Sequence, residues 1–162
     1  MSRHAILTSE DHRELRVHVQ PSAKLGDAVM TAFTVPLEFR RIQHEFPILF
    51  RRDTRTRDFS ALALLGFESG ENLYLDGDRW DAEYKPLSLA IQPFLVGRPA
   101  DAEGPAQVHV DLDHPRIAQS GEGMLLFEPS GQPTPYLERI GSMLAELDQG
   151  HALRARFYAA LG

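Results

Sequence analysis

The dipeptide Asp76-Gly77 is the sequence feature that most constrains the fold of this chain. Leu73-Tyr74-Leu75 precedes it and Asp78-Arg79-Trp80 follows it. Asp-Gly tolerates the positive φ that a tight primed turn requires, so this pattern predicts a β-hairpin. A chain built around such a hairpin is expected to contain antiparallel sheet.

Several other segments predict strands that pair in the same way. Ile48–Phe50 and Phe59–Phe67 are apolar runs on either side of the charged stretch Arg51–Asp58, which favours a second hairpin. The alternation in Gln107–Leu112 predicts a half-buried strand, and Met124–Phe127 predicts another.

Two segments carry helix-start signals, a threonine followed by a proline. The first begins at Thr34, with Pro36 two positions later, and is stopped by Pro47, which cannot continue a helix. The second begins at Thr134-Pro135 and shows apolar residues at helical spacing to Leu147, with Gly150 expected to end or kink it before a second helical piece to Leu161. The elements together predict an α+β fold: a mostly antiparallel sheet, an N-proximal helix and a C-terminal amphipathic helix.

The length of 162 residues predicts a single domain over 1–162, in which the polar residues 1–28 are the most loosely ordered. The absence of cysteine excludes disulfides and thiolate metal sites. No cleaved-signal pattern or apolar run long enough to span a bilayer is present, so a cytoplasmic protein is expected. A formal charge of −6 argues against nucleic acid as a partner.

Several segments resemble a known family in order and spacing. They are Glu38-Phe39, Glu45-Phe46-Pro47-Ile48, Ala63-Leu64-Leu65-Gly66, GENLYLDGDRWDAEYKP from Gly70 to Pro86, Gln92-Pro93-Phe94, Asp111-Leu112-Asp113-His114-Pro115, and GQPTPYL from Gly131 to Leu137. Over about residues 35–145 the chain resembles the SapC family of bacterial proteins.

The resemblance implies a bacterial protein linked by name to surface arrays and often found beside flavin-dependent halogenases and outer-membrane transporters. It implies no established activity, no cofactor and no catalytic residue. The stretch after Leu147 is shorter than the C-terminal part that family members usually carry, and His109 and His114 stand where the family does not generally have histidine.

The leading hypothesis is a non-enzymatic accessory protein that binds a peptide or protein partner, such as a flavin-dependent halogenase or a surface or transport component. The partner would dock in a groove beside the Asp-Gly hairpin or add a strand to a sheet edge. Guanidinium groups suit carboxylates and aromatic rings offer a platform, although a solvated loop and cross-strand packing explain the same residues. The candidate binding residues are Arg51, Arg52, Arg55, Arg57, Tyr74, Trp80 and Tyr84.

Two alternatives come from other residues. His109 and Asp111 lie two apart on a strand and so share a face, and His151 would complete the two-histidine, one-carboxylate site of an iron oxygenase. The preferred reading places His109 and Asp111 on the solvent side of a half-buried strand, and the leading hypothesis assigns no metal ligand. The apolar stripe of the helix from Pro135 to Leu147, together with the segment to Leu161, would also suit a symmetric homodimer.

Overall fold

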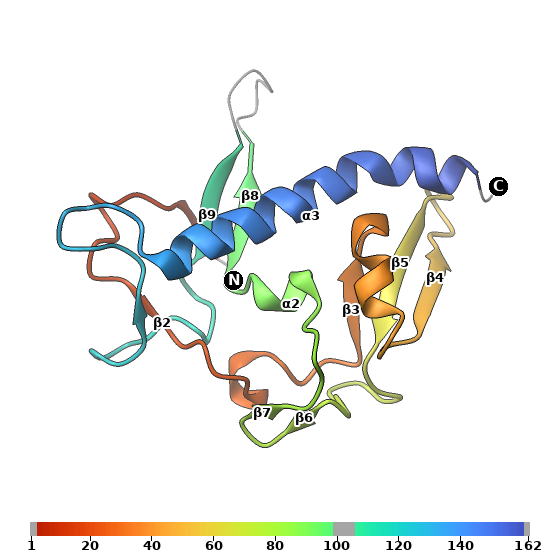
Figure 1. Cartoon of the computed structure of the whole chain (residues 1–162), viewed down its shortest axis with the longest axis horizontal. Helices are drawn as coiled ribbons and strands as arrows, with labels where there is room; N and C mark the ends of the chain where they lie inside the picture. The colour runs from red at the N-terminus through yellow and green to blue at the C-terminus, as the bar shows by residue number, and fades with distance from the viewer. Residues whose placement is uncertain (1–2, 99–105, 161–162) are drawn as a thin grey trace. The chain divides into compact units, whose positions relative to one another are not determined.

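A computed structural model describes residues 3–98 and 106–160. The chain has the α+β composition that the sequence predicts, with small antiparallel sheets, a short helix near Pro36 and a long C-terminal helix (Figure 1). It divides into two compact units. The first comprises Met1–Gln20 and Ile91–Ala145, and the second comprises Pro21–Ala90 and Glu146–Gly162.

The first unit contains two antiparallel sheets. Strands β1 (His4–Ile6), β9 (Gln107–Asp111) and β8 (Phe94–Gly97) form a three-stranded sheet in the order β1-β9-β8, and β8 and β9 lie side by side in Figure 1. Strand β2 (Arg16–Val17) pairs with β10 (Met124–Leu125). Two of these strands therefore lie in the segment expected to be loosely ordered, of which residues 1–2 lie outside the described residues.

The second unit is built on the sheet β3-β5-β4, whose strands are antiparallel (Figure 1). β3 spans Thr31–Thr34, β4 spans Ile48–Arg52 and β5 spans Phe59–Leu64. The predicted Asp-Gly hairpin is confirmed, since β6 (Leu75–Asp76) pairs with β7 (Arg79–Trp80) and Gly77 has a φ of 63°.

Short helices connect these strands. The 3₁₀ turn η1 spans Ala23–Leu25, η2 spans Pro36–Glu38 and leads into α1 (Phe39–Ile42), and α2 spans Leu87–Ala90. The helix predicted to run to Pro47 thus ends earlier. Its expected cap is also wrong: Val35 occupies the cap position, and the Thr34 hydroxyl donates a hydrogen bond to the Glu38 carboxylate instead.

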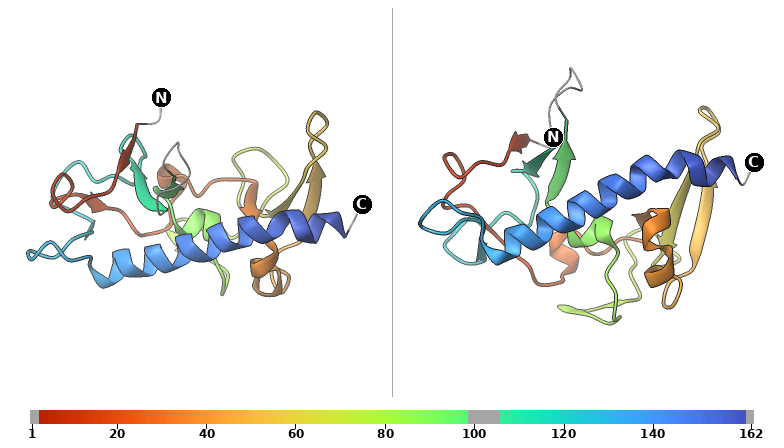
Figure 2. Two further views of the ribbon diagram at one scale, coloured as in Figure 1. Left: turned by 90° about the horizontal axis from the view of Figure 1, so that it is seen from above. Right: turned by 45° about the horizontal axis from the view of Figure 1, so that its top comes forward.

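The C-terminal helix α3 runs from Pro135 to Ala159 without a break, as both views in Figure 2 show. The Thr134 hydroxyl accepts a hydrogen bond from the Leu137 amide at 3.4 Å and so caps the helix as predicted. The expected end or kink at Gly150 is wrong. A Cβ at Gly150 would overlap the Val35 side chain, so glycine here allows close packing and does not interrupt the helix.

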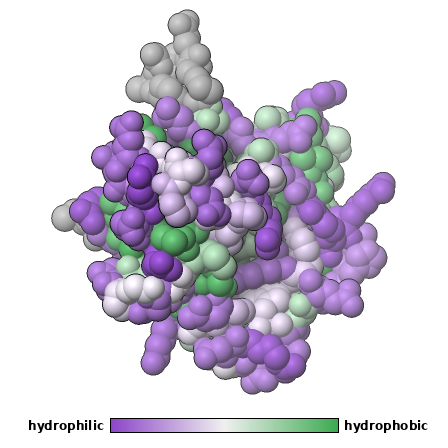
Figure 3. All heavy atoms as spheres, turned by 60° about the vertical axis from the view of Figure 1, so that its left-hand side comes forward, coloured by the Kyte–Doolittle hydropathy of each residue, from purple (hydrophilic) through white to green (hydrophobic). Residues whose placement is uncertain are grey.

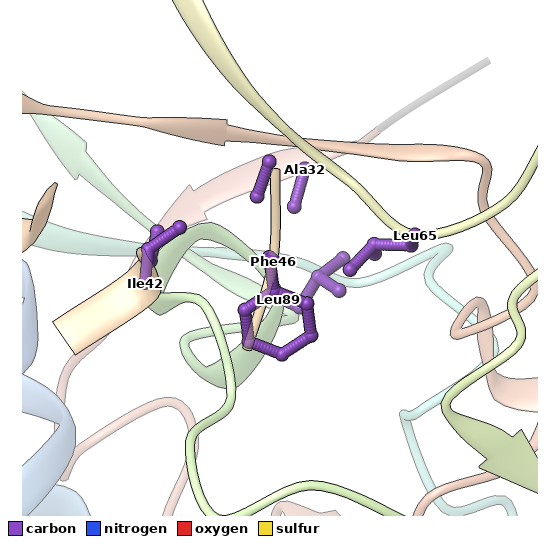
Figure 4. Packing of buried hydrophobic residues seen from close by; sticks show 6 residues of the cluster. Ala32, Ile42, Phe46, Leu65 and Leu89 are labelled. Atoms are coloured by element: carbon purple, nitrogen blue, oxygen red, sulfur yellow. The ribbon is translucent and has the colours of Figure 1, made fainter. Parts of the chain in front are cut away.

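The core of the second unit gathers residues from β3, α1, β5 and α2 (Figure 4). Its buried members are Ala32, Ile42, Phe46, Ala63, Leu65 and Leu89. Because Phe46 is almost fully buried at its centre, truncation to alanine is expected to lower the stability by about 3–5 kcal/mol. This core holds the sheet that carries the candidate functional residues.

Candidate functional site

The turn between β4 and β5 is ordered by its own hydrogen bonds. One Asp53 carboxylate oxygen accepts the backbone amides of Arg55 at 2.8 Å and Thr56 at 2.9 Å. These two bonds hold the pKa of the Asp53 carboxyl below its ordinary value. Arg57 closes the turn with a φ of 67° and donates its amide to the Asp53 carbonyl. These bonds fix the backbone of the turn that carries Arg55 and Arg57.

All four candidate arginines lie on this hairpin, and all four are exposed. Arg51 and Arg52 end β4, and Arg55 and Arg57 lie in the turn. The Arg52 guanidinium lies over the Phe59 ring, 5.3 Å from its centroid, and bonds the Arg57 carbonyl. The arginines thus form one basic hairpin tip on a chain whose formal charge is −6.

Strand β4 has a free backbone edge. The hydrogen bonds Leu64 N–Pro47 O and Asp53 N–Asp58 O mark the two ends of its ladder with β5. Since bonded and non-bonded pairs alternate in an antiparallel ladder, Ile48, Phe50 and Arg52 direct their backbone groups away from β5. No described residue bonds those groups, and β4 is the outer strand of its sheet in Figure 1.

The side chains along β4 are also more exposed to solvent than is usual for large hydrophobic residues. Leu49 is 45% exposed and Phe50 is 47% exposed, although both are large hydrophobic residues. The Phe50 ring contacts the rings of Phe39, Phe157 and Tyr158, so that face of the strand is partly covered by α1 and α3. An exposed edge with apolar side chains is a ready template for another strand.

A pocket of about 310 Å³ lies beside the turn of the hairpin, and Asp58 is among its lining residues. Arg57 and Phe59 line it from the hairpin, and Arg154 and Tyr158 line it from α3. Burial raises the pKa of the Tyr158 hydroxyl, an effect that Arg154 opposes.

The three candidate aromatic residues have internal roles. The Tyr74 hydroxyl donates to the Glu45 carbonyl at 2.7 Å, and the Trp80 indole donates to the Tyr84 carbonyl at 2.8 Å. All three pack against the core of the second unit. Lys85 lies over the Trp80 ring and Arg41 over the Tyr84 ring. Cross-strand and core packing therefore accounts for their contacts.

Acidic residues that the sequence analysis did not single out hold this region together. Glu45 accepts the backbone amides of Glu83 and Tyr84, both at 2.8 Å. Asp27 is almost fully buried and pairs with Lys85 at 2.7 Å. The signal for Glu45 was its place in the motif Glu45-Phe46-Pro47-Ile48, which the resemblance includes without assigning it a role.

The residues of the proposed iron site have local partners of their own. His109 and Asp111 belong to the first unit and His151 to the second. Asp111 accepts the Arg3 and Asp113 amides, both at 3.1 Å. The His151 ring stacks on Phe33, and its pKa is lowered by burial and by Arg154. Within residues 3–98 and 106–160, no group of three or more potential ligands gathers at one point.

The chain belongs to the SapC family, whose family model matches residues 7–162. This match extends beyond the segment of about residues 35–145 on which the resemblance rests. No curated protein and no solved structure matches the chain. Among the described residues, none of the helices has the length and hydrophobicity needed to cross a bilayer.

Proposed function

We propose that this SapC-family protein is a non-enzymatic accessory protein that binds an acidic, extended segment of a partner protein by strand addition to β4. The observation that carries the proposal is the backbone edge of β4 at Ile48, Phe50 and Arg52, which no described residue pairs with. Main-chain hydrogen bonds provide the affinity in this recognition mode, and side chains provide the specificity.

The charge of the hairpin selects the chemistry of the partner. Four exposed arginines lie within seven positions, 51–57, of an otherwise acidic chain. Guanidinium groups bind carboxylates through two parallel hydrogen bonds, and a basic patch attracts an acidic partner during encounter. A nucleic acid would use the arginines but not the strand edge, because it has no peptide backbone to pair with β4.

The turn geometry favours binding at low entropic cost. The Asp53 carboxylate fixes the turn before any partner arrives, and the Arg52 side chain is held over Phe59. A site that is already ordered loses less conformational freedom on binding. The site residues are therefore the arginines at 51, 52, 55 and 57 together with the β4 edge, and the three aromatic residues support the scaffold.

The direct test uses Arg52→Pro, with Arg52→Ala as its matched control. Both variants remove the guanidinium, but only proline removes the outward N–H, and proline is tolerated on edge strands at such positions. Short peptides selected from a random display library against the purified chain serve as probes. We expect acidic peptides rich in β-branched residues, and about tenfold weaker binding to Arg52→Pro than to Arg52→Ala.

Equal binding of the selected peptides to the two variants would remove strand addition as the mode of recognition. Selection of no peptide, or of peptides without acidic residues, would contradict the proposed partner chemistry. The oligomeric mass of the free chain provides an independent check. A mass of two chains that Arg52→Pro reduces to one would identify the occupant of the edge as a second copy.

A further inference from the structure

The first unit contains a cavity of about 500 Å³ that the proposed strand addition does not use. Its volume lies in the range of about 300–1,000 Å³ that is typical of small-molecule sites. The walls are mainly hydrophobic: Ile6 and Leu7 lie beside Val108, and Phe127 and Leu137 complete the lining. On the face shown in Figure 3, hydrophobic residues reach the surface between polar ones.

Gly141 lies on the helical wall of this cavity, within α3. Glycine is less favourable than alanine in a helix interior, so its presence there calls for a reason. Gly150 in the same helix has one, since a Cβ would overlap Val35. At Gly141 a Cβ would meet no atom within 4 Å. The packing of the protein does not require the glycine, and the space it leaves belongs to the cavity.

The electrostatic character of the cavity comes from Glu138. It is the one charged side chain among the described residues that line the cavity, and it lies three positions before Gly141 on the same helix face. Its carboxylate has no hydrogen bond or ion pair with a described residue. A ligand with a cationic group would give this carboxylate a partner beside an apolar surface.

We propose that this cavity binds a small molecule with an apolar body and a protonated amino group. The body packs against the hydrophobic wall and over Gly141, and the ammonium group pairs with the Glu138 carboxylate. The site lies within the first unit and shares no residue with the β4 hairpin. The proposed ligand binding can therefore be tested independently of the proposed peptide binding.

Three probes that share a phenethyl body and differ in their polar end test the ligand chemistry: phenethylamine, phenethyl alcohol and hydrocinnamate. Each is titrated into ¹⁵N-labelled full-length protein while the amide signals of Val108 and Gly141 are followed. We expect saturable shifts with the amine and at least about tenfold weaker binding of the acid. An acid that binds as tightly as the amine, or an amine that gives no saturable shift, would overturn the proposal.

Variants of the cavity test its location. Gly141→Leu fills the open space, and Ser142→Leu places the same side chain at the next, exposed position outside the cavity. Phenethylamine should not bind the Gly141→Leu variant, and it should bind the Ser142→Leu variant as it binds the unchanged protein. Equal binding to both would place the ligand elsewhere and refute the assignment. Amide spectra of each variant establish that it remains folded.

The charge variant Glu138→Gln tests the carboxylate. It should bind phenethylamine and phenethyl alcohol with equal affinity, because the amide keeps the size of the side chain but not its charge. A preference for the amine that survives in Glu138→Gln would show that another group recognises the ammonium, and the role of Glu138 would be wrong.

Discussion

The Tyr84 hydroxyl donates a hydrogen bond of 2.8 Å to the carboxylate of Glu38, a residue with no exposed surface. The same carboxylate oxygen accepts the Leu87 amide at 2.6 Å, and the other accepts the Thr34 hydroxyl at 2.7 Å. A buried carboxylate is stable only when donors replace the water that it has lost. Glu38 therefore ties β3, α2 and the segment after β7 to one point in the second unit.

Replacement of Tyr84 by phenylalanine tests how much its hydrogen bond to Glu38 contributes to stability. The change leaves the ring in place but removes one donor from a buried carboxylate, so the free energy of unfolding should fall by about 2 kcal/mol. Urea denaturation followed by circular dichroism measures the effect. Tyr136→Phe is the control: the Tyr136 ring contacts Phe94, and its hydroxyl bonds no described residue, so its stability should change little. Equal losses in the two variants would contradict a specific role for the Glu38 contact.

The same contact predicts how stability depends on pH in alkaline solution. Burial, followed by the charge of Glu38, raises the pKa of the Tyr84 hydroxyl well above its ordinary value. Because the folded pKa is the higher one, the contribution is fully present below the unfolded value of about 10 and is lost as the pH rises above it. The free energy of unfolding, measured in urea from neutral pH upwards, should fall more steeply above pH 10 in the native chain than in Tyr84→Phe. Parallel curves for the two proteins would contradict this.

The local sequence was sufficient to predict the hairpins and the start of α3. The Asp76-Gly77 turn needs only its own backbone conformation, and Thr134 caps α3 through a bond to a residue three positions away. The free edge of β4 could not be predicted, because it depends on which strand takes the central position. The sequence shows that β4 and β5 are neighbours but not that β3 pairs with the other side of β5.

The same limit applies to Glu38 and the aromatic residues. The sequence assigns Glu38 only a place in the segment Glu38-Phe39 of the family resemblance, because its partners Tyr84 and Leu87 lie 46 and 49 positions away. Tyr74 and Trp80 were candidate contacts for a partner, and their polar atoms bond the backbone of the second unit instead. The same residue types serve in ligand binding and in holding the fold together. The sequence therefore does not distinguish the two roles, and the contacts in the structure do.

The two glycines of α3 make a matched pair for a stability test. Gly150→Ala should destabilise the protein, because the new Cβ would overlap Val35 and overpacking costs about 1–3 kcal/mol. Gly141→Ala should stabilise it by about 1 kcal/mol, because the helix gains propensity and the Cβ meets no atom. Thermal and urea denaturation of both variants measure the difference. Stabilisation by both changes would mean that α3 does not pack closely on Val35.

His109, the first histidine of the alternative iron site, lies on β9. Its imidazole lies directly over Gly97, so that a Cβ at Gly97 would overlap the ring. This contact joins two neighbouring strands, since β8 pairs with β9 along Phe94–Gly97. Gly97→Ala should lower the free energy of unfolding by about 1–3 kcal/mol, because the ring has to leave its position.

A double-mutant cycle identifies the cause of that loss. In a His109→Ala background the ring is absent, so Gly97→Ala should change the stability little, and the coupling energy between the two positions should reach about 1–2 kcal/mol. Urea denaturation of the four proteins gives this energy directly. Coupling near zero would mean that the imidazole is free to leave Gly97, as a metal ligand facing solvent would be. Substantial coupling would assign His109 to the packing of the β8–β9 pair, because a ring held against the neighbouring strand contributes to the fold through the surface that it covers.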